Sequence, residues 1–342
     1  MDFDFSFEQQ LIARSVRASL EELPPVMNGA PFPYQAKNVT ERFANLGLFP
    51  SASAEEPPLG FVDAVVIAIE IGRHLPAAPA IEQLAASLWL WPSRRDLCAT
   101  LANGEMITVA VGGACERQGD RFEGRVLVPF VTEAKAVLAP MATGAERQWL
   151  VLPAEMLTLS TAETSDITVD ASWVELSGST SATVLLSNPA VAFDDVLALL
   201  AMAEMVGAAE VSLQKTIAYI RERKQFGKPI GSNQAIKHMA ADAASSLEIM
   251  KAAVEYGGWS FDQVATKGSG FLEEARMALL TARSFVGEHA RLVLERCIQM
   301  HGGIAFTWDY GLHRYLRRII YRTGTLVRTM ESREAIAAKM LP

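Results

Sequence analysis

The stretch Arg223-Lys224-Gln225-Phe226-Gly227, with Pro229-Ile230 and Gln234-Ala235 after it, separates two long apolar segments of this 342-residue chain. The next long segment ends in a second stretch, Gln299-Met300-His301-Gly302-Gly303, which continues as Ile304-Ala305-Phe306-Thr307-Trp308. Together the two stretches supply a cation, an aromatic ring, amide side chains and a glycine pair. This combination suits a large anionic ligand. The long apolar segments that carry the stretches predict packed helices.

Arg223 and Phe226 have two possible roles. A guanidinium donates two parallel hydrogen bonds to a phosphate and keeps its charge at any working pH. An aromatic ring such as Phe226 stacks on the flat face of a nucleotide or flavin, and Gly227 indicates a turn. The structural alternative is an exposed arginine at a helix end and a phenylalanine that fills a corner of the bundle. The residues alone leave both open.

Gln299, Gly302 and Gly303 also have two compatible roles. A glycine pair lets the backbone approach a ligand closely and exposes its amide groups, and Gln299 adds a directional donor and acceptor. The same glycines are typical of a helix C-cap.

Composition restricts the function. The chain is 50% hydrophobic and carries a net charge of -8, so we expect a large core and no general nucleic-acid binding. The cysteines Cys98, Cys115 and Cys297 are far apart and lack metal-ligand spacing, so we expect buried thiols and no metal site.

We expect no membrane segment, because no apolar run approaches the roughly 20 residues needed to span a bilayer. The alanine-rich stretch from Ala198 to Ala209 contains Glu204 and is expected to be a buried helix. The start, Met1-Asp2-Phe3-Asp4-Phe5, lacks the basic region of a signal peptide, which favours a cytoplasmic protein.

Changes of hydrophobic period predict an α+β fold in three parts: an N-terminal helical domain (1–105), a small middle antiparallel β domain (106–190) and a C-terminal four-helix-bundle domain (191–342). In the first part Ser6-Phe7-Glu8-Gln9 is a capping box, and Pro24-Pro25 ends the helix that follows it. A second helix is predicted from Phe61 to Ile71, ending at Gly72. Two more helices are predicted at 80–90 and 96–102.

The predicted strands are short β-branched or apolar runs separated by turn residues such as Gly119-Asp120 and Gly144. They are 107–111, 122–128, 136–138, 149–152 and 183–186. The predicted long helices of the last part are 196–223, 233–257, 270–300 and 326–340.

The two opening stretches resemble, in the same order, the R-x-x-F-G and Q-x-x-G-G motifs of the acyl-CoA dehydrogenase family, and the three-part plan resembles the family's domains. The resemblance implies FAD, an acyl-CoA substrate and an oxidoreductase reaction that removes hydrogen from the α and β carbons. In the family these motifs hold the adenosine and pyrophosphate half of a FAD shared across a subunit interface. The positions so implied as cofactor-binding are Arg223, Gln225, Phe226, Gln234, Gln299, Gly302 and Gly303.

The family's catalytic base is missing. The reaction needs a carboxylate to remove the α-proton. The two family positions for that glutamate correspond here to Thr323 and Leu197. Asp195 matches the aspartate of a family D-x-x-R element whose arginine is replaced by Ala198. Asp195 and Glu204 are weak substitute candidates, with a helix N-terminal charge and a paired helical glutamate as their plain alternatives.

The flavin-ring segment is also missing. The region from Val109 to Glu116 does not match the family segment that contacts the isoalloxazine ring. The chain therefore resembles the degenerate, non-catalytic subunit of heterotetrameric (α2β2) acyl-CoA dehydrogenases that act on steroid side-chain CoA thioesters. That resemblance implies a catalytic acyl-CoA dehydrogenase subunit as partner. The alternatives are a homomeric enzyme with an unusual base and a structural module without flavin.

A basic run from His313 to Arg318 falls on a predicted helix, where Arg314 and Arg318 share a face. Its default interpretation is a solvated face. The alternative is a contact with an anionic cofactor or partner.

Overall fold

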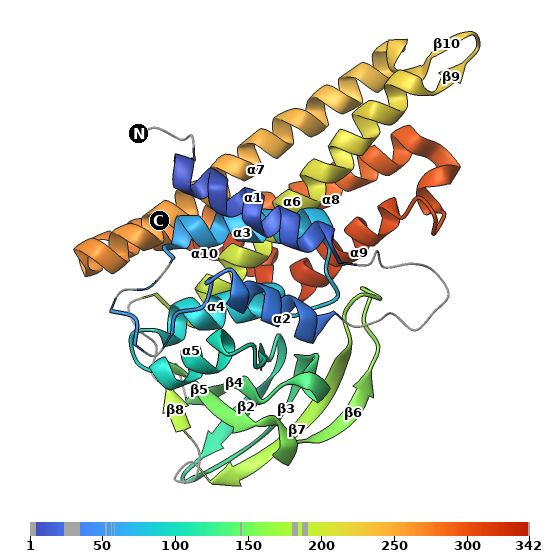
Figure 1. Ribbon diagram of the computed structural model, residues 1–342. Coiled ribbons are helices and arrows are strands. Elements are labelled where there is room, and N and C mark those ends of the chain that lie inside the picture. Colours follow the sequence, from blue (N-terminus) through green and yellow to red (C-terminus); the bar gives the residue numbers. More distant parts are fainter. Residues whose placement is uncertain are drawn as a thin grey trace.

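Helices and a β-sheet occupy separate parts of the molecule, so the fold is α+β as predicted (Figure 1). The predicted boundaries at Pro24-Pro25, Gly144 and Thr183 lie outside the described residues. The division into domains at 105 and 190 stays a prediction. The computed structural model describes residues 5–23, 35–51, 53–55, 57, 59–143, 146–179, 184–186 and 191–340.

Five helices precede the sheet. The predicted capping box at the start of the first is confirmed, because Ser6 Oγ accepts the Gln9 N–H at 3.2 Å and Gln9 Oε1 accepts the Ser6 N–H at 3.0 Å. The prediction that Gly72 ends the third helix is wrong. That helix continues to His74, and Leu75 ends it with a left-handed backbone (φ 49°). The helices are α1 Phe7–Glu21, α2 Ala36–Asn45, α3 Phe61–His74, α4 Ala80–Leu90 and α5 Arg95–Ala102.

The sheet is mixed, whereas the sequence predicted an antiparallel one. Most neighbouring strands are antiparallel, but β4 pairs in parallel with both β1 and β2. The hydrogen-bonded order is β6-β7-β3-β2-β4-β5-β8, with β1 beside β4. A separate small core of apolar side chains, including Val126, Val137 and Val174, lies among the strands. The strands are β1 Ile107–Val109, β2 Gly112–Gln118, β3 Arg121–Pro129, β4 Ala136–Thr143, β5 Glu146–Pro153, β6 Thr158–Ala162, β7 Ala171–Ser179 and β8 Val184–Leu186.

The predicted long C-terminal helices are confirmed, and α9 covers the basic run. A two-strand hairpin joins α6 to α7 and projects from the body of the molecule (Figure 1). These elements are α6 Phe193–Glu222, β9 Lys224–Gln225, β10 Lys228–Pro229, α7 Gln234–Lys267, α8 Leu272–His301, α9 Leu312–Arg322 and α10 Thr329–Met340.

Helix α6 is the central element. It packs against α3, α4, α7, α8 and α9. Contrary to the expectation that no run was long enough, this 30-residue helix is long and apolar enough to cross a membrane by length and composition. However, 94% of its most apolar window is buried inside the protein, which confirms the prediction of a buried helix from Ala198 to Ala209. One such buried helix is weak evidence for a membrane segment.

Two glycines bring α3 and α6 into backbone contact. A Cβ atom on Gly207 would lie 1.9 Å from the Ile69 carbonyl oxygen, and one on Gly72 would lie 1.9 Å from the Glu204 carbonyl oxygen. No side chain fits at either distance. Gly72 is therefore inside α3 because the helix crossing requires it there.

Candidate functional site

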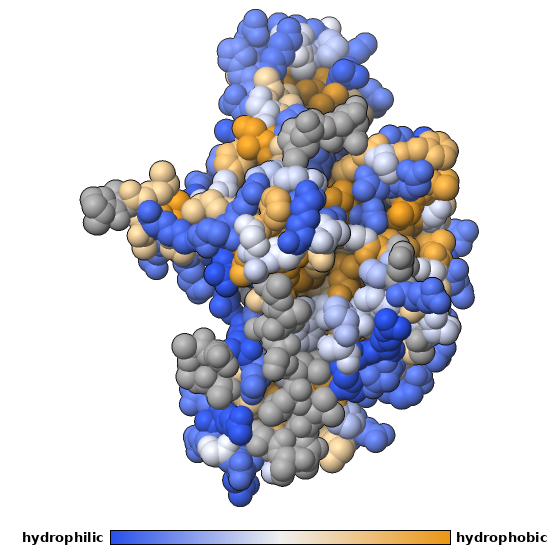
Figure 2. All heavy atoms as spheres, turned by 90° about the vertical axis from the view of Figure 1, so that its left-hand side faces the viewer, coloured by the Kyte–Doolittle hydropathy of each residue, from blue (hydrophilic) through white to orange (hydrophobic). Residues whose placement is uncertain are grey.

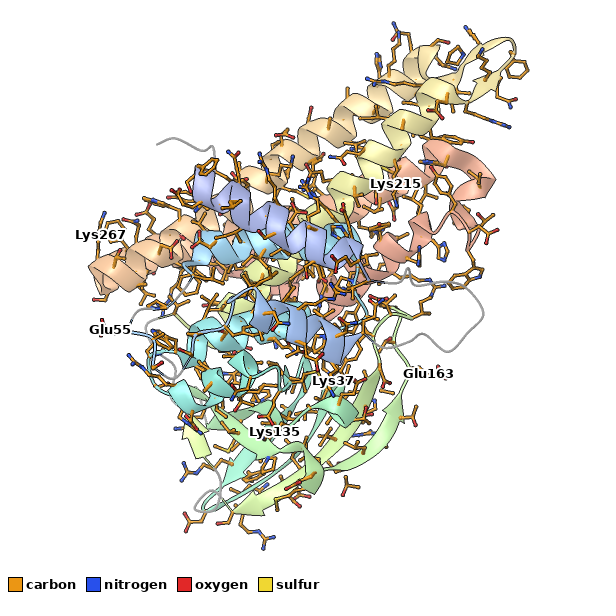
Figure 3. All side chains as sticks on the ribbon, viewed as in Figure 1. Lys37, Glu55, Lys135, Glu163, Lys215 and Lys267 are labelled. Carbon is orange, nitrogen blue, oxygen red and sulfur yellow. The ribbon has the colours of Figure 1, made fainter. Side chains whose placement is uncertain are left out.

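The first stretch forms the tip of the α6–α7 hairpin. Phe226 and Gly227 both have positive φ (51° and 80°), as the two central residues of a tight hairpin turn require. Phe226 is 100% exposed, so the alternative that it fills a corner of the bundle is wrong within this chain. Arg223 and Gln225 are also exposed. Figure 3 shows the side chains of the tip directed away from the protein, at the opposite end of α7 from Lys267.

The second stretch ends α8. Gly302 is the C-cap of this helix with φ 68°, so the predicted C-cap is confirmed. Gln299, Gly302 and Gly303 are exposed, and apart from the adjoining residues no described atom lies within 4 Å of where a Cβ on either glycine would be. The backbone at the end of α8 is therefore open to a ligand or partner. Gln234, the first residue of α7, is also exposed, next to the N-cap Asn233.

Aromatic contacts hold the two stretches at one end of the molecule. The ring of Tyr219, one turn before Arg223 on α6, stacks on the His301 imidazole with centroids 4.5 Å apart. The seven predicted cofactor-binding residues are all exposed, and none lines the main cavity of the described structure. On this chain they form an open surface.

The main cavity lies elsewhere, between the sheet and helices α6, α8 and α10. It has a volume of about 660 Å³. Leu197, one of the two expected base positions, lines it. Thr323, the other, does not, although Thr325 and Leu326 do. The remaining wall includes Val111, Gly112, Gly113, Trp149, Asp194, Asp195, Arg147, Arg283, Arg328 and Glu331.

Every carboxylate on the described wall of this cavity is paired with an arginine of the same wall. Arg147 pairs with Asp194. Arg283 Nη2 lies 3.2 Å from Asp195 Oδ1. Arg328 Nη1 lies 3.6 Å from Glu331 Oε2. The cations and carboxylates of the wall therefore largely neutralise one another.

Asp195 and Glu204, the weak base candidates, differ in their surroundings. Burial raises the pKa of Asp195 above its ordinary value, although Arg283 opposes the shift. Burial would also raise the pKa of Glu204, but Arg322 and Arg318 outweigh it and hold that pKa below the usual range. Glu204 is fully buried and is not on the cavity wall. Of the two, only Asp195 lies on the cavity wall and has a pKa above its ordinary value.

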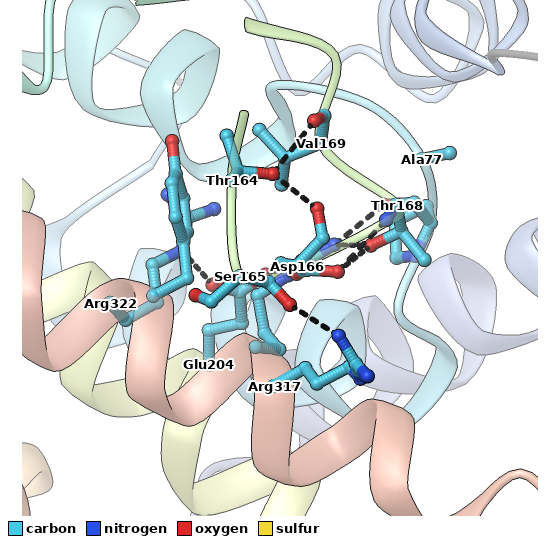
Figure 4. Close-up of polar contacts among 12 residues, drawn as sticks. Ala77, Thr164, Ser165, Asp166, Thr168, Val169, Glu204, Arg317 and Arg322 are labelled. Carbon is cyan, nitrogen blue, oxygen red and sulfur yellow. Dashed lines mark hydrogen bonds and ion pairs between the residues drawn. The ribbon is translucent and has the colours of Figure 1, made fainter. Parts of the chain in front are cut away.

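Arg318 corrects the interpretation of the basic run. Its side chain is 1% exposed rather than solvated, and it pairs with Asp166 and Glu204. Its Nη2 also donates to Thr168 Oγ1 at 2.7 Å. Figure 4 shows Asp166, Glu204 and Arg322 gathered in this network. No local sequence signal indicates this burial, because the pairing partners of Arg318 are more than 100 residues away.

Comparisons with known proteins agree with this geometry. Residues 195–323 match the family described as acyl-CoA dehydrogenase, C-terminal domain. The chain is 39% identical over 124 residues to acyl-CoA dehydrogenase IpdE2 of Mycolicibacterium smegmatis, covering 36% of each protein. It is 29% identical over 289 residues to acyl-CoA dehydrogenase FadE34 of Mycobacterium tuberculosis, covering 80% of this chain and 38% of that protein. The matched segments thus span little more than a third of either relative.

Two solved structures share the fold over nearly the whole chain. A chain of the ChsE4-ChsE5 complex from Mycobacterium tuberculosis superposes with a TM-score of 0.79 at 20% identity and covers 100% of both chains. A chain of a Tcur3481-Tcur3483 steroid ACAD variant superposes with a TM-score of 0.77 at 23% identity, covering 97% of this chain and 99% of that one. At these identities the likeness shows the fold, which is acyl-CoA dehydrogenase-like.

Proposed function

We propose that the chain is the partner subunit of a FAD-dependent acyl-CoA dehydrogenase, because residues 195–323 match the family described as acyl-CoA dehydrogenase, C-terminal domain. In this proposal it lacks the catalytic base and completes the FAD site of a second, catalytic subunit in an α2β2 assembly. The substrate class would be a steroid side-chain CoA thioester.

The observation that carries the proposal is the separation of the two sites. The predicted cofactor-binding residues are exposed at one end of the molecule, outside the main cavity. The cavity itself has Leu197 at one expected base position and only arginine-paired carboxylates on its described wall. A surface open to a neighbour, together with a separate cavity whose described wall has no unpaired carboxylate, fits a subunit that supplies half a cofactor site.

The exposed residues fit the adenosine and pyrophosphate half of FAD. Arg223 is exposed and takes part in none of the ion pairs among the described residues, so its guanidinium can hold a pyrophosphate. Phe226 presents both faces of its ring to solvent. The Gly302 and Gly303 backbone has room for a ligand against it. Bound FAD would supply the hydride acceptor, and the catalytic subunit would supply the base and the contacts to the flavin ring.

Relatives support the partner and the substrate class. The two solved structures are described as a ChsE4-ChsE5 complex and as a steroid ACAD named by two components.

Hydrophobic patches also lie between hydrophilic residues on the face shown in Figure 2. Phe306 and Trp308, beyond the glycine pair, are 66% and 38% exposed and are suited to burial by a partner.

Co-expression with a complete acyl-CoA dehydrogenase chain tests the proposal. We expect the lone chain to be colourless or poorly soluble and the complex to be yellow and active. In the complex, Arg223→Ala should weaken FAD binding about 10- to 100-fold, because a charge-assisted bidentate contact is lost. Flavin affinity is measured by titration of the apo complex.

Arg117→Ala is the matched control, because Arg117 is an exposed arginine on β2, in the sheet rather than on the hairpin. It should leave flavin affinity unchanged. A lone chain that purifies as an active, fully flavinated homotetramer would contradict the proposal. Unchanged flavin affinity in Arg223→Ala would favour a structural module without flavin.

A second candidate is a self-sufficient dehydrogenase that uses Asp195 as its base. The observation in its favour is that Asp195 lines the cavity and has a pKa raised by burial. In that case Asp195→Asn should reduce turnover at least about 100-fold, the usual contribution of a general base. Asp194→Asn is its control, because Asp194 lines the same cavity. Equal steady-state rates for the Asp195→Asn and wild-type proteins would remove this candidate.

A further inference from the structure

We infer that His301 is a positioning residue that holds the two halves of the exposed flavin-binding surface together. This inference rests on the proposed function, because it concerns how that surface keeps its shape. His301 lies inside the second stretch, between Gln299 and Gly302, but it is buried and does not face solvent.

The hydrogen bonds of His301 define its form. Nδ1 lies 2.8 Å from the Cys297 carbonyl oxygen, which only accepts, so Nδ1 carries the proton. Nε2 lies 2.7 Å from Tyr310 Oη and accepts the hydroxyl proton. Burial lowers the pKa of His301 and favours this neutral form. One ring therefore uses both nitrogens within the protein.

The same ring contacts α6 through two residues. It stacks on Tyr219 at a 24° angle between the planes, and Thr216 Oγ1 lies 3.5 Å from Nδ1. The Tyr219 carbonyl oxygen accepts the Arg223 N–H at 2.9 Å. His301 is thus connected by one stacking contact and one backbone hydrogen bond to the residue proposed to hold the pyrophosphate.

His301 also contacts the connection between α8 and α9, residues 302–311, which contains Gly302 and Gly303. His301 directly precedes this connection, and its hydrogen-bond partner Tyr310 lies near the connection's end. The Tyr310 ring also meets the Tyr219 ring edge-on, with centroids 6.2 Å apart. The three rings form one cluster between the last turn of α6 and the glycine segment. Loss of the His301 contacts would leave only the edge contact between Tyr219 and Tyr310 in this cluster, so the two halves would be held together less firmly.

Flavin titration of the complex tests this role. His301→Phe keeps a flat ring but removes both hydrogen bonds, and we expect flavin affinity about five- to tenfold weaker. Tyr310→Phe removes only the donor to Nε2, and its effect should be smaller. His301→Gln places an amide oxygen near the Nε2 position and keeps an acceptor for Tyr310, but it loses the ring that stacks on Tyr219, so its affinity should lie between that of His301→Phe and that of wild type.

His289→Phe is the matched control. His289 lies on the same helix, its Nδ1 lies 3.0 Å from the Phe285 carbonyl oxygen, and its ring stacks on Phe285. It should not change flavin affinity. The flavin that remains bound in His301→Phe should have the visible spectrum of wild type, because in the proposed assembly the catalytic subunit holds the isoalloxazine ring.

Three outcomes separate the possibilities. Unchanged affinity in His301→Phe, with weakened affinity in Arg223→Ala, overturns the positioning role and leaves the proposed function intact. Unchanged affinity in both variants removes the proposed function as well. If His301→Phe and His301→Gln lose flavin equally and in proportion to a lower melting temperature, His301 is only a core residue, and the inference is wrong.

Discussion

Gly207 and Gly72 show how a single residue type decides a helix crossing. Sequence patterns treat glycine as a helix end, and Gly72 was predicted in that role. In the structure both glycines lie inside helices, at the point where the backbones of α3 and α6 touch. The close approach that these glycines allow involves a partner helix far away in the sequence. Local spacing therefore cannot distinguish such a glycine from one that ends a helix.

Gly207→Ala tests the crossing. The added Cβ would lie 1.9 Å from the Ile69 carbonyl oxygen, so the helices must separate. We expect the free energy of unfolding to fall by about 3 kcal/mol, the upper range for overpacking a core. Gly270→Ala is the control, because nothing lies within 4 Å of its Cβ position. Thermal unfolding that gives equal stabilities for the two variants would contradict the steric explanation.

Arg318 and Phe226 mark the limits of prediction at single residues. The spacing of Arg314 and Arg318 correctly predicted a shared helix, yet Arg318 is buried in ion pairs. Phe226 is apolar but 100% exposed. Exposure depends on what the rest of the chain places beside a residue. For Arg223, Gln299 and the glycine pair, side-chain chemistry suggested a role, but the cofactor contacts themselves remain predictions.

At the scale of elements, the long helices were predictable and several strands were not. The backbone hydrogen bonds of helices α6, α7 and α8 are formed within each helix, so their hydrophobic periodicity can be recognised in the local sequence. Strand β2 has the sequence Gly-Gly-Ala-Cys-Glu-Arg-Gln and no β-branched residue. It forms because β3 pairs with it on one side and β4 on the other. The same non-local pairing explains why β6 and β7 were missed and why the sheet is mixed.

The candidate site lies at the ends of two helices, α6 and α8. The hairpin after α6 and the turn after α8 each begin where a helix stops, and both have positive-φ residues at that point. The sequence predicted both turns from their glycines. It did not predict that Tyr219, His301 and Tyr310 form one aromatic cluster between them, because these contacts join α6 to the end of α8. Motifs locate a site, whereas packing determines its geometry.

For the whole molecule, a buried ion network joins parts that are distant in sequence. Arg318 and Arg322 on α9 pair with Glu204 on α6, with Asp166 between β6 and β7, and with Glu82 on α4. All five side chains are at most 2% exposed. The network therefore connects the sheet to helices on both sides of it in the chain. Arg322 of this network directly precedes Thr323, one of the two positions at which the family resemblance places the catalytic base.

The network makes the stability of the folded protein depend on pH. Arginines hold the pKa values of Asp166 and Glu204 below their ordinary values of 3.8 and 4.5, despite burial. The unfolded chain binds these protons more readily than the folded one. The stability that the network contributes is therefore complete above pH 4.5. It is lost as the pH falls through the lower pKa values that Asp166 and Glu204 have in the folded state.

Glu204→Gln should remove part of this dependence and lower the free energy of unfolding by about 3–5 kcal/mol at pH 7, because two buried arginines lose a shared partner. The control is Glu175→Gln, which breaks the exposed pair with Arg125 and should cost no more than about 1 kcal/mol. Thermal unfolding at pH 7 and below pH 4.5 measures both effects. If Glu204→Gln matches Glu175→Gln at pH 7, the network does not join the sheet to the helices energetically, and the apolar core that the strands share with the helices must hold them together instead.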